Sequence, residues 1–309
     1  MSNRPNPKSS KSPGSKAPAK GTTARGRTVA AQRQQATTSK ATWIMGGIAI
    51  VILVALIVAV VVARSGSSNK AGTVATADPA AVVSQVAAVN EAVITSVGQG
   101  SITALPIPLA DGTPALAKDG KPLVVYIGAE FCPFCAAERW PMVQALSRFG
   151  SFSGVGVTHS SGQDVFPNTP TFTFHGATYT SSVLSFEGVE TQTSDRKPLD
   201  TLTPEQEALI TTYDAPPYVP SASKGSIPFI DFGGRYVLSG ASYSPAVLQG
   251  MTADEVAAAL SDPNSAVTKG IIGAANMITA TICILTNDQP SNVCANPAVI
   301  AFEAQIKAQ

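Results

Sequence analysis

The chain has 309 residues, of which 13% are charged, and its formal net charge is +1. This near-zero total hides a segregation of charge, because residues 1–42 hold nine Lys or Arg and no Asp or Glu, whereas residues 71–309 hold ten basic and twenty acidic residues. The chain carries no nucleotide-binding loop and no nucleic-acid signature beyond the basic N-terminal segment. We therefore expect no nucleic-acid partner and no bound cofactor.

The N-terminal quarter of the chain has the pattern of a membrane anchor. Residues 1–42 are rich in Ser, Pro, Lys, Ala and Thr, a composition that predicts a disordered cytoplasmic tail. Residues 43–63 are twenty-one residues without a charge, long enough to cross a hydrocarbon core of roughly 30 Å. A cleaved signal peptide is the alternative, although its apolar stretch is usually shorter, about 7 to 15 residues.

The excess of Lys and Arg before the apolar stretch predicts a cytoplasmic N-terminus. We therefore expect a single-pass protein of the cell membrane, with a linker over residues 64–78 and one extracytoplasmic domain over residues 79–309. All four cysteines fall in that domain, which fits an oxidising compartment.

The domain begins with helical and strand signals in alternation. Valines at helical spacing predict an amphipathic helix from Pro79 to near Gly98. The short apolar run 122–128 predicts a buried strand, and residues 136–149 predict a helix that Pro141 kinks. Alternating segments between residues 151 and 202 predict strands and loops.

The C-terminal half reads as helices separated by one hairpin. Thr203 and Thr252 each open a capping box, which predicts helices to about Tyr213 and Leu260. Between them, the two glycines 233–234 separate two apolar runs and predict a tight strand–turn–strand unit. Residues 266–285 predict a last long helix.

The chemistry of the domain centres on Cys132-Pro133-Phe134-Cys135. A pair placed where a strand ends and a helix begins puts its first sulfur at the positive end of the helix dipole, which favours the thiolate. We therefore expect Cys132 to be the nucleophile and Cys135, one turn along, to be the buried resolving cysteine. A zinc site and a static disulfide are the alternatives, but the chain offers no second ligand pair with zinc spacing, so we expect no metal.

A second element, Ile227-Pro228, opens a strand downstream of the cysteine motif. If this bond is cis, the backbone of Ile227 would lie beside the sulfurs and could pair with an extended substrate. An ordinary trans proline at a strand start is the alternative.

The order of strand, CPFC motif, kinked helix, IPF segment, hairpin and last helix resembles the thioredoxin fold. More narrowly, GAEFCPFCAAERWPMVQALSRFG, DVFPNTPTFTF and ATICILTNDQPSNVC are similar to a prokaryotic thioredoxin-like family catalogued as domain of unknown function 929. This resemblance, over roughly residues 80–300, implies an α/β fold with a central sheet flanked by helices and an extracytoplasmic location. The family's activity is not settled, so the resemblance implies no substrate.

The sequence departs from the thioredoxin pattern in the length between Cys132 and Pro228, which predicts an insertion over about residues 160–222. Phe131 stands where thioredoxins place Trp. Glu130 is the nearest upstream acid, and we interpret it as a solvated charge rather than a proton acceptor. His159 and His175 have no partner pattern that indicates catalysis.

The remaining pair, Cys283 and Cys294, brackets a loop that contains Pro and Asn. Of three possible connectivities for four cysteines, the one with two local pairs is the most economical. Because nothing in the flanks of Cys283 and Cys294 lowers a thiol pKa, we expect a structural disulfide between them. A second redox pair is the alternative.

These features predict a thiol:disulfide oxidoreductase that acts on exported cysteine-containing proteins, with Cys132, Cys135 and Pro228 at its site. Whether a membrane redox partner serves it stays open. The competing class is a non-catalytic thioredoxin-like binding module with structural disulfides, and the third is a copper(I) metallochaperone using the CPFC thiolates.

Overall fold

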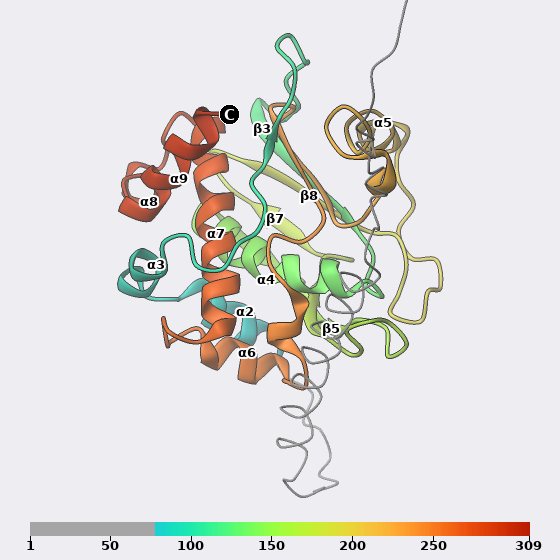
Figure 1. The fold of residues 1–309 in the computed structure, drawn as a ribbon, viewed down its shortest axis with the longest axis vertical. Helices are drawn as coiled ribbons and strands as arrows, with labels where there is room; N and C mark the ends of the chain where they lie inside the picture. The colour runs from blue at the N-terminus through green and yellow to red at the C-terminus, as the bar shows by residue number, and fades with distance from the viewer. Residues whose placement is uncertain (1–77) are drawn as a thin grey trace, which may run out of the picture. The chain divides into compact units, whose positions relative to one another are not determined.

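The computed structural model describes residues 78–309 (Figure 1). The expected tail at 1–42, membrane helix at 43–63 and nearly all of the linker at 64–78 lie outside the described residues. Within residues 78–309, α7 (Ala266–Leu285) is the one single helix long and apolar enough to cross a membrane, and 89% of its most apolar 18-residue stretch is buried. It serves as a core helix of the domain.

The domain is a mixed α/β structure around a central sheet. The strand order is β1-β10-β9-β3-β2, and β8 pairs with β3 off this path. β8 is parallel to β3, whereas β9 is antiparallel to both β3 and β10. The strands are β1 (Ile107–Pro108), β2 (Ala117–Lys118), β3 (Lys121–Gly128), β8 (Ser185–Glu190), β9 (Phe229–Phe232) and β10 (Tyr236–Ser239).

Helices cover both faces of this sheet, as Figure 1 shows for α4 and α7 on one side and α5 on the other. The strand β3 contributes to the core on both faces of the sheet, because its successive side chains point to opposite faces. Val124 and Tyr126 are buried against the α4 and α7 side, whereas Val125 and Ile127 are buried against the α5 side. Covered on both faces, β3 is apolar almost throughout, which is typical of a parallel strand.

The helices begin at residues suited to their ends. Side-chain oxygens cap most of them, and Thr203 and Thr252 form the two capping boxes predicted from the sequence. The α-helices are α2 (Pro79–Ala87), α3 (Glu91–Val97), α4 (Pro133–Ser147), α5 (Pro204–Tyr213), α6 (Ala253–Ala259), α7, α8 (Ser291–Cys294) and α9 (Pro297–Lys307).

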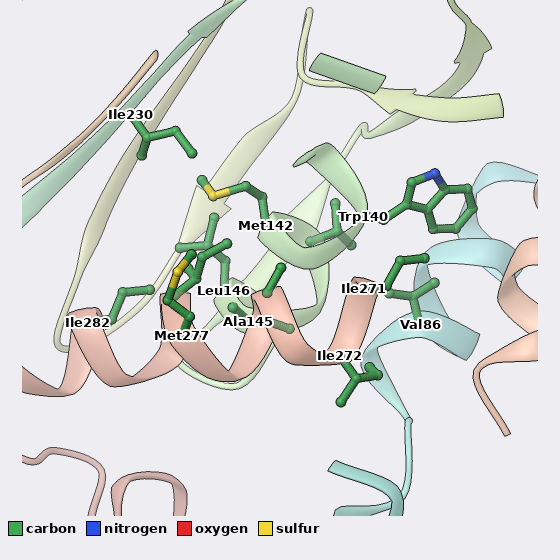
Figure 2. Close-up of a cluster of buried hydrophobic side chains, with 14 of the residues drawn as sticks. Val86, Trp140, Met142, Ala145, Leu146, Ile230, Ile271, Ile272, Met277 and Ile282 are labelled. Atoms are coloured by element: carbon green, nitrogen blue, oxygen red, sulfur yellow. The ribbon is translucent and has the colours of Figure 1, made fainter. Parts of the chain in front are cut away.

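The main core forms where α7 packs on α4. Figure 2 shows Met142 and Leu146 of α4 facing Met277 of α7, with Ile230 of β9 and Val86 of α2 at the edges of the cluster. All five side chains are at most 1% exposed. At roughly 1.5–3 kcal/mol for each such side chain, this contact fixes α4, and therefore the cysteine motif at its start, to the rest of the domain.

The single helix expected from Pro79 to near Gly98 is wrong in one respect. The chain forms two helices, α2 and α3, which are bent by 66° at a short break. Asn90 causes the second start, because its side-chain oxygen accepts a hydrogen bond from the backbone N–H of Ala92 at 2.7 Å. The valines of this segment follow a helical period on both sides of the break, so their spacing alone does not show where the break lies.

The segment 160–222, expected as an insertion, contributes to the central sheet through β8 and to its cover through α5. Additional strands precede β8 and form two small antiparallel pairs, β4 with β7 and β5 with β6. These are β4 (Ser151–Ser153), β5 (Gly156–His159), β6 (Pro170–Thr173) and β7 (Thr178–Thr180).

The hairpin between β9 and β10 turns at Gly233 and Gly234, as predicted. Their φ angles are +65° and +64°, left-handed values that glycine adopts most readily, and the backbone N–H of Arg235 donates to the carbonyl of Phe232 across the turn. A Cβ on Gly234 would also overlap the carbonyl oxygen of Pro114.

Candidate active site

The cysteine motif occupies the strand-to-helix junction that the sequence predicts. β3 ends at Gly128 and α4 begins at Pro133, so Cys132 is the N-cap residue, with φ −77° and ψ 120°. Its Sγ accepts a hydrogen bond from the backbone N–H of Cys135 at 3.2 Å. A helix N-terminus presents unpaired N–H groups and partial positive charge, and here one of those groups is directed at a sulfur.

The two thiols differ in ionisation. Both are free, and Cys132 is 5% exposed whereas Cys135 is 0% exposed. The hydrogen bond from the Cys135 side chain lowers the pKa of Cys132 below its usual value, helped by the backbone N–H of Cys135 and by the charge of Arg139. Burial raises the pKa of Cys135 well above its usual value. The site therefore favours a thiolate on Cys132 and a thiol on Cys135, the division expected of a nucleophile and a resolving cysteine.

The Ile227-Pro228 segment lies against the cysteine motif. Its peptide bond is cis, and the Sγ of Cys132 lies 3.6 Å from the carbonyl oxygen of Ile227, to which the thiol donates. Pro228 is buried and Ile227 is half-buried. The structure thus brings Cys132, Cys135 and Ile227-Pro228 together, although 95 residues separate Cys132 from Ile227.

Two loops flank the motif, one before β6 and one after β8. The backbone N–H of Ser161 donates to the carbonyl of Phe131 at 2.9 Å, and the guanidinium of Arg196 lies 3.8 Å from the centre of the Phe131 ring. Phe134 is 40% exposed and meets Phe166 edge to face, with ring centres 5.9 Å apart. The surface beside Cys132 is therefore partly apolar.

A hollow of about 560 Å³ lies elsewhere, at the opposite end of the sheet. It is lined by the Gly233-Gly234 turn, by Lys121 at the start of β3 and by Leu285. The cysteines lie at the other end of β3, where Cys132 is nearly and Cys135 completely buried.

Sequence reasoning missed two buried charges on α4. Arg139 is 0% exposed and makes a two-pronged ion pair with Glu190 at the end of β8, with N–O distances of 2.7 and 2.5 Å. Glu138 is also 0% exposed and accepts hydrogen bonds from the backbone N–H and the hydroxyl of Ser242, at 2.8 and 2.7 Å. Burial raises the pKa of Glu138 to about 7. No local pattern in the sequence marks them, and in the structure every residue of α4 from Cys135 to Leu146 is buried.

The remaining titratable candidates make local contacts. Nδ1 of His159 lies 2.8 Å from the carbonyl of Ser160, and Nδ1 of His175 lies 2.6 Å from a carboxylate oxygen of Asp200. The backbone N–H of Glu130 donates to the carbonyl of Gln192. Over residues 78–309, no three His, Cys, Asp or Glu side chains gather closely enough to hold a metal ion.

The second cysteine pair forms the predicted disulfide. Cys283 in the last turn of α7 is bonded to Cys294 in α8, with Cα atoms 5.7 Å apart. Both residues are buried within the main core. The bond therefore fastens α8, and the start of α9 behind it, to the core helix.

Comparison with protein families matches residues 112–284 to the family described as "Domain of unknown function (DUF929)". This range includes the CPFC motif, α4, the Ile227-Pro228 segment and Cys283 of the disulfide. Neither a comparison with curated proteins nor one with solved structures finds a match. Since the matched range covers more than half of the chain, the chain belongs to the DUF929 family.

Proposed function

We propose that this protein is a thioredoxin-like thiol:disulfide oxidoreductase in which Cys132 exchanges disulfides with cysteine-containing polypeptides. The observation that carries the proposal is the placement of Cys132, whose sulfur accepts the Cys135 N–H at a helix start and lies beside the Ile227 carbonyl. The order of β3, α4, β8, β9, β10 and α7, with β8 parallel and β9 antiparallel to β3, supports a thioredoxin-like frame.

The exchange proceeds in two steps that conserve electrons. In the reducing direction the Cys132 thiolate attacks one sulfur of a substrate disulfide, which forms a mixed disulfide and releases the other substrate sulfur as a thiolate. Cys135 then loses its proton and attacks Cys132, which releases the second substrate thiolate and leaves a Cys132–Cys135 disulfide. In the oxidising direction the same bonds form and break in reverse, and two electrons pass from the substrate dithiol to the protein.

The expected surroundings favour the oxidising direction. The apolar residues 43–63 and the basic residues before them support a single-pass anchor with the domain outside the cytoplasm. The Cys283–Cys294 disulfide is compatible with that placement, because disulfides persist in oxidising compartments. We propose exported cysteine-containing proteins as substrates, whose extended chain would pair with the backbone of Ile227.

Trapping of the mixed disulfide tests the proposal. Cys135→Ser removes the resolving thiol, so Cys132 should stay covalently bound to an offered disulfide-containing polypeptide and to cysteine proteins in cells. Cys132→Ser is the matched control and should form no such adduct. If both variants give equal adducts, or neither does, Cys132 is not the exchanging nucleophile and the proposal is wrong.

A non-catalytic binding module is the second candidate. The low exposure of Cys132, 5%, favours it, because a nucleophile must be reached by its partner. In that case the CPFC disulfide would resist mild reductants, and the Cys135→Ser variant would remain free of adducts while still binding its partner.

A further inference from the structure

A buried group of charged and polar side chains lies at the sheet edge where the cysteine motif begins. Gly128 and Glu190 are register partners at the ends of the parallel strands β3 and β8, so the carboxylate of Glu190 and the CPFC loop belong to the same edge. The hydroxyl of Tyr126 folds back over Gly128, where a Cβ would overlap it. Arg139 reaches this edge from α4 and pairs with Glu190.

Arg139 is close to both thiols by its position in the helix. It follows Cys135 by four residues on α4, a spacing that places two side chains on one face with Cβ atoms about 5–6 Å apart. Its charge lowers the pKa of Cys132 and, against the stronger effect of burial, that of Cys135. Among residues 78–309, neither Nη1 of Arg139 nor the hydroxyl of Tyr126 has a hydrogen-bond partner.

The Arg139–Glu190 ion pair is unusual because it is fully buried. A buried charge pair is often no more stabilising than apolar side chains of the same volume, because both charges lose their hydration. Both partners here are 0% exposed, and Glu190 also lies 3.4 Å from the backbone N–H of Phe174. A role of the pair in the chemistry next to it would account for its presence better than a role in stability.

Resting on the proposed function, we propose that Arg139 is a positioning residue whose guanidinium stabilises the thiolate of the reduced cysteine pair, and that Glu190 limits how much of this positive charge the sulfurs experience. The two residues act with opposite sign. Removal of the Arg139 charge disfavours the thiolate, whereas removal of the Glu190 charge leaves Arg139 uncompensated and favours the thiolate further.

Tyr126 faces the same group without changing this sign. Burial raises the pKa of Tyr126 well above its usual value, so its phenol stays neutral in the physiological range. Burial is the largest single effect on Arg139 and lowers its pKa, but the charge and hydrogen bond of Glu190 together with the charges of Tyr126 and Cys135 outweigh it and raise the pKa above its usual value. The guanidinium therefore keeps its positive charge at every pH at which the thiols titrate.

The test uses two near-isosteric variants of the full-length chain in mild detergent, Arg139→Met and Glu190→Gln. The pKa of Cys132 is measured from the pH dependence of its alkylation rate, with the modified peptide identified by mass spectrometry. Arg139→Met should raise this pKa by about one unit and Glu190→Gln should lower it by about one unit, the lower end of the range for a nearby charge. Each unit is a tenfold change in the ratio of thiolate to thiol.

Arg139→Lys is the conservative control, since it keeps the charge and should return the pKa of Cys132 to within about a third of a unit of the wild type. At pH 8.5 the equilibrium constant for oxidation by glutathione should rise several-fold in Arg139→Met and fall several-fold in Glu190→Gln, because a stabilised thiolate favours the reduced form.

A purely structural role would move both variants in the same direction, or neither, and Arg139→Lys would not restore the pKa. Either result overturns the inference, and if Arg139→Met does not fold, a Glu190→Gln variant with an unchanged or raised pKa overturns it alone. If wild-type Cys132 exchanges with glutathione but its pKa does not shift as expected in the variants, the inference about Arg139 and Glu190 is wrong and the proposed function stands. Wild-type Cys132 that does not exchange would refute the proposed function itself.

Discussion

Glu138→Gln should make the domain more stable at neutral and alkaline pH. Glu138 is completely buried and has no cationic partner among residues 78–309, and its pKa of about 7 compares with an ordinary value of 4.5. Between these two pH values the native state holds the proton and the unfolded state does not, so stability falls as pH rises. A difference of this size corresponds to roughly 3 kcal/mol, lost in full above about pH 7.

Glutamine has the shape of the protonated carboxyl and preserves its contacts. Its amide oxygen can accept from the backbone N–H of Ser242, and its NH₂ can donate to the Ser242 hydroxyl, the two groups that Glu138 now contacts. The variant and the wild type should therefore be equally stable near pH 4.5. At pH 8 the variant should be more stable by about 3 kcal/mol.

Urea unfolding at a series of pH values measures this difference, with the fluorescence of the buried Trp140 as the signal. Asp195→Asn, at an exposed carboxylate, is the control and should follow the wild-type pH dependence. Other buried acids, such as Asp231, affect both proteins equally and cancel in the comparison. A Glu138→Gln variant whose stability tracks the wild type at every pH would refute the reasoning.

Three further predictions concern the frame around the site. Gly128→Ala should lower the free energy of unfolding by about 1–3 kcal/mol, because the added Cβ overlaps the Tyr126 hydroxyl; chemical denaturation measures it, and a neutral effect would contradict the close packing. Replacing Cys283 and Cys294 with Ala should cost about 3 kcal/mol, from the loop of 11 residues that their bond closes, and an unchanged unfolding midpoint would argue against this. Asp231→Asn should reduce the loss of stability as pH rises from about 4 to 6, since burial raises the pKa of Asp231 from 3.8 to about 6, and an unchanged pH profile by calorimetry would count against it.

Much of the fold is encoded in local signals and was predictable. Thr203 and Thr252 open their helices through capping boxes, and the long apolar helix begins at Ala266 and ends at Leu285, as expected. The strand before Cys132 and the helix after it follow from the apolar run and from Pro133 at the first helical position. Such signals depend on neighbours within four residues, so a single sequence is enough to find them.

Features that depend on distant partners were not predictable. β8 lies within the segment 160–222, and only its pairing with β3 places it in the central sheet. In the sequence, Glu138 and Arg139 have the pattern of ordinary charges on a helix surface. In the structure, α7, β8 and the Ser242 loop enclose α4 and bury them. The partner of Glu138 lies 104 residues away and that of Arg139 lies 51 residues away, beyond the reach of a local pattern.

The proposed function requires that Cys132 and Cys135 form a reversible redox pair. The most direct test equilibrates the full-length chain in glutathione buffers of graded ratio, traps the thiols and identifies the trapped peptides by mass spectrometry. We expect this pair to titrate reversibly between about −120 and −270 mV, the range of known dithiol catalysts, while Cys283–Cys294 stays oxidised. A Cys132–Cys135 pair that remains oxidised below about −300 mV would behave as a structural disulfide, and the proposed oxidoreductase function would be wrong.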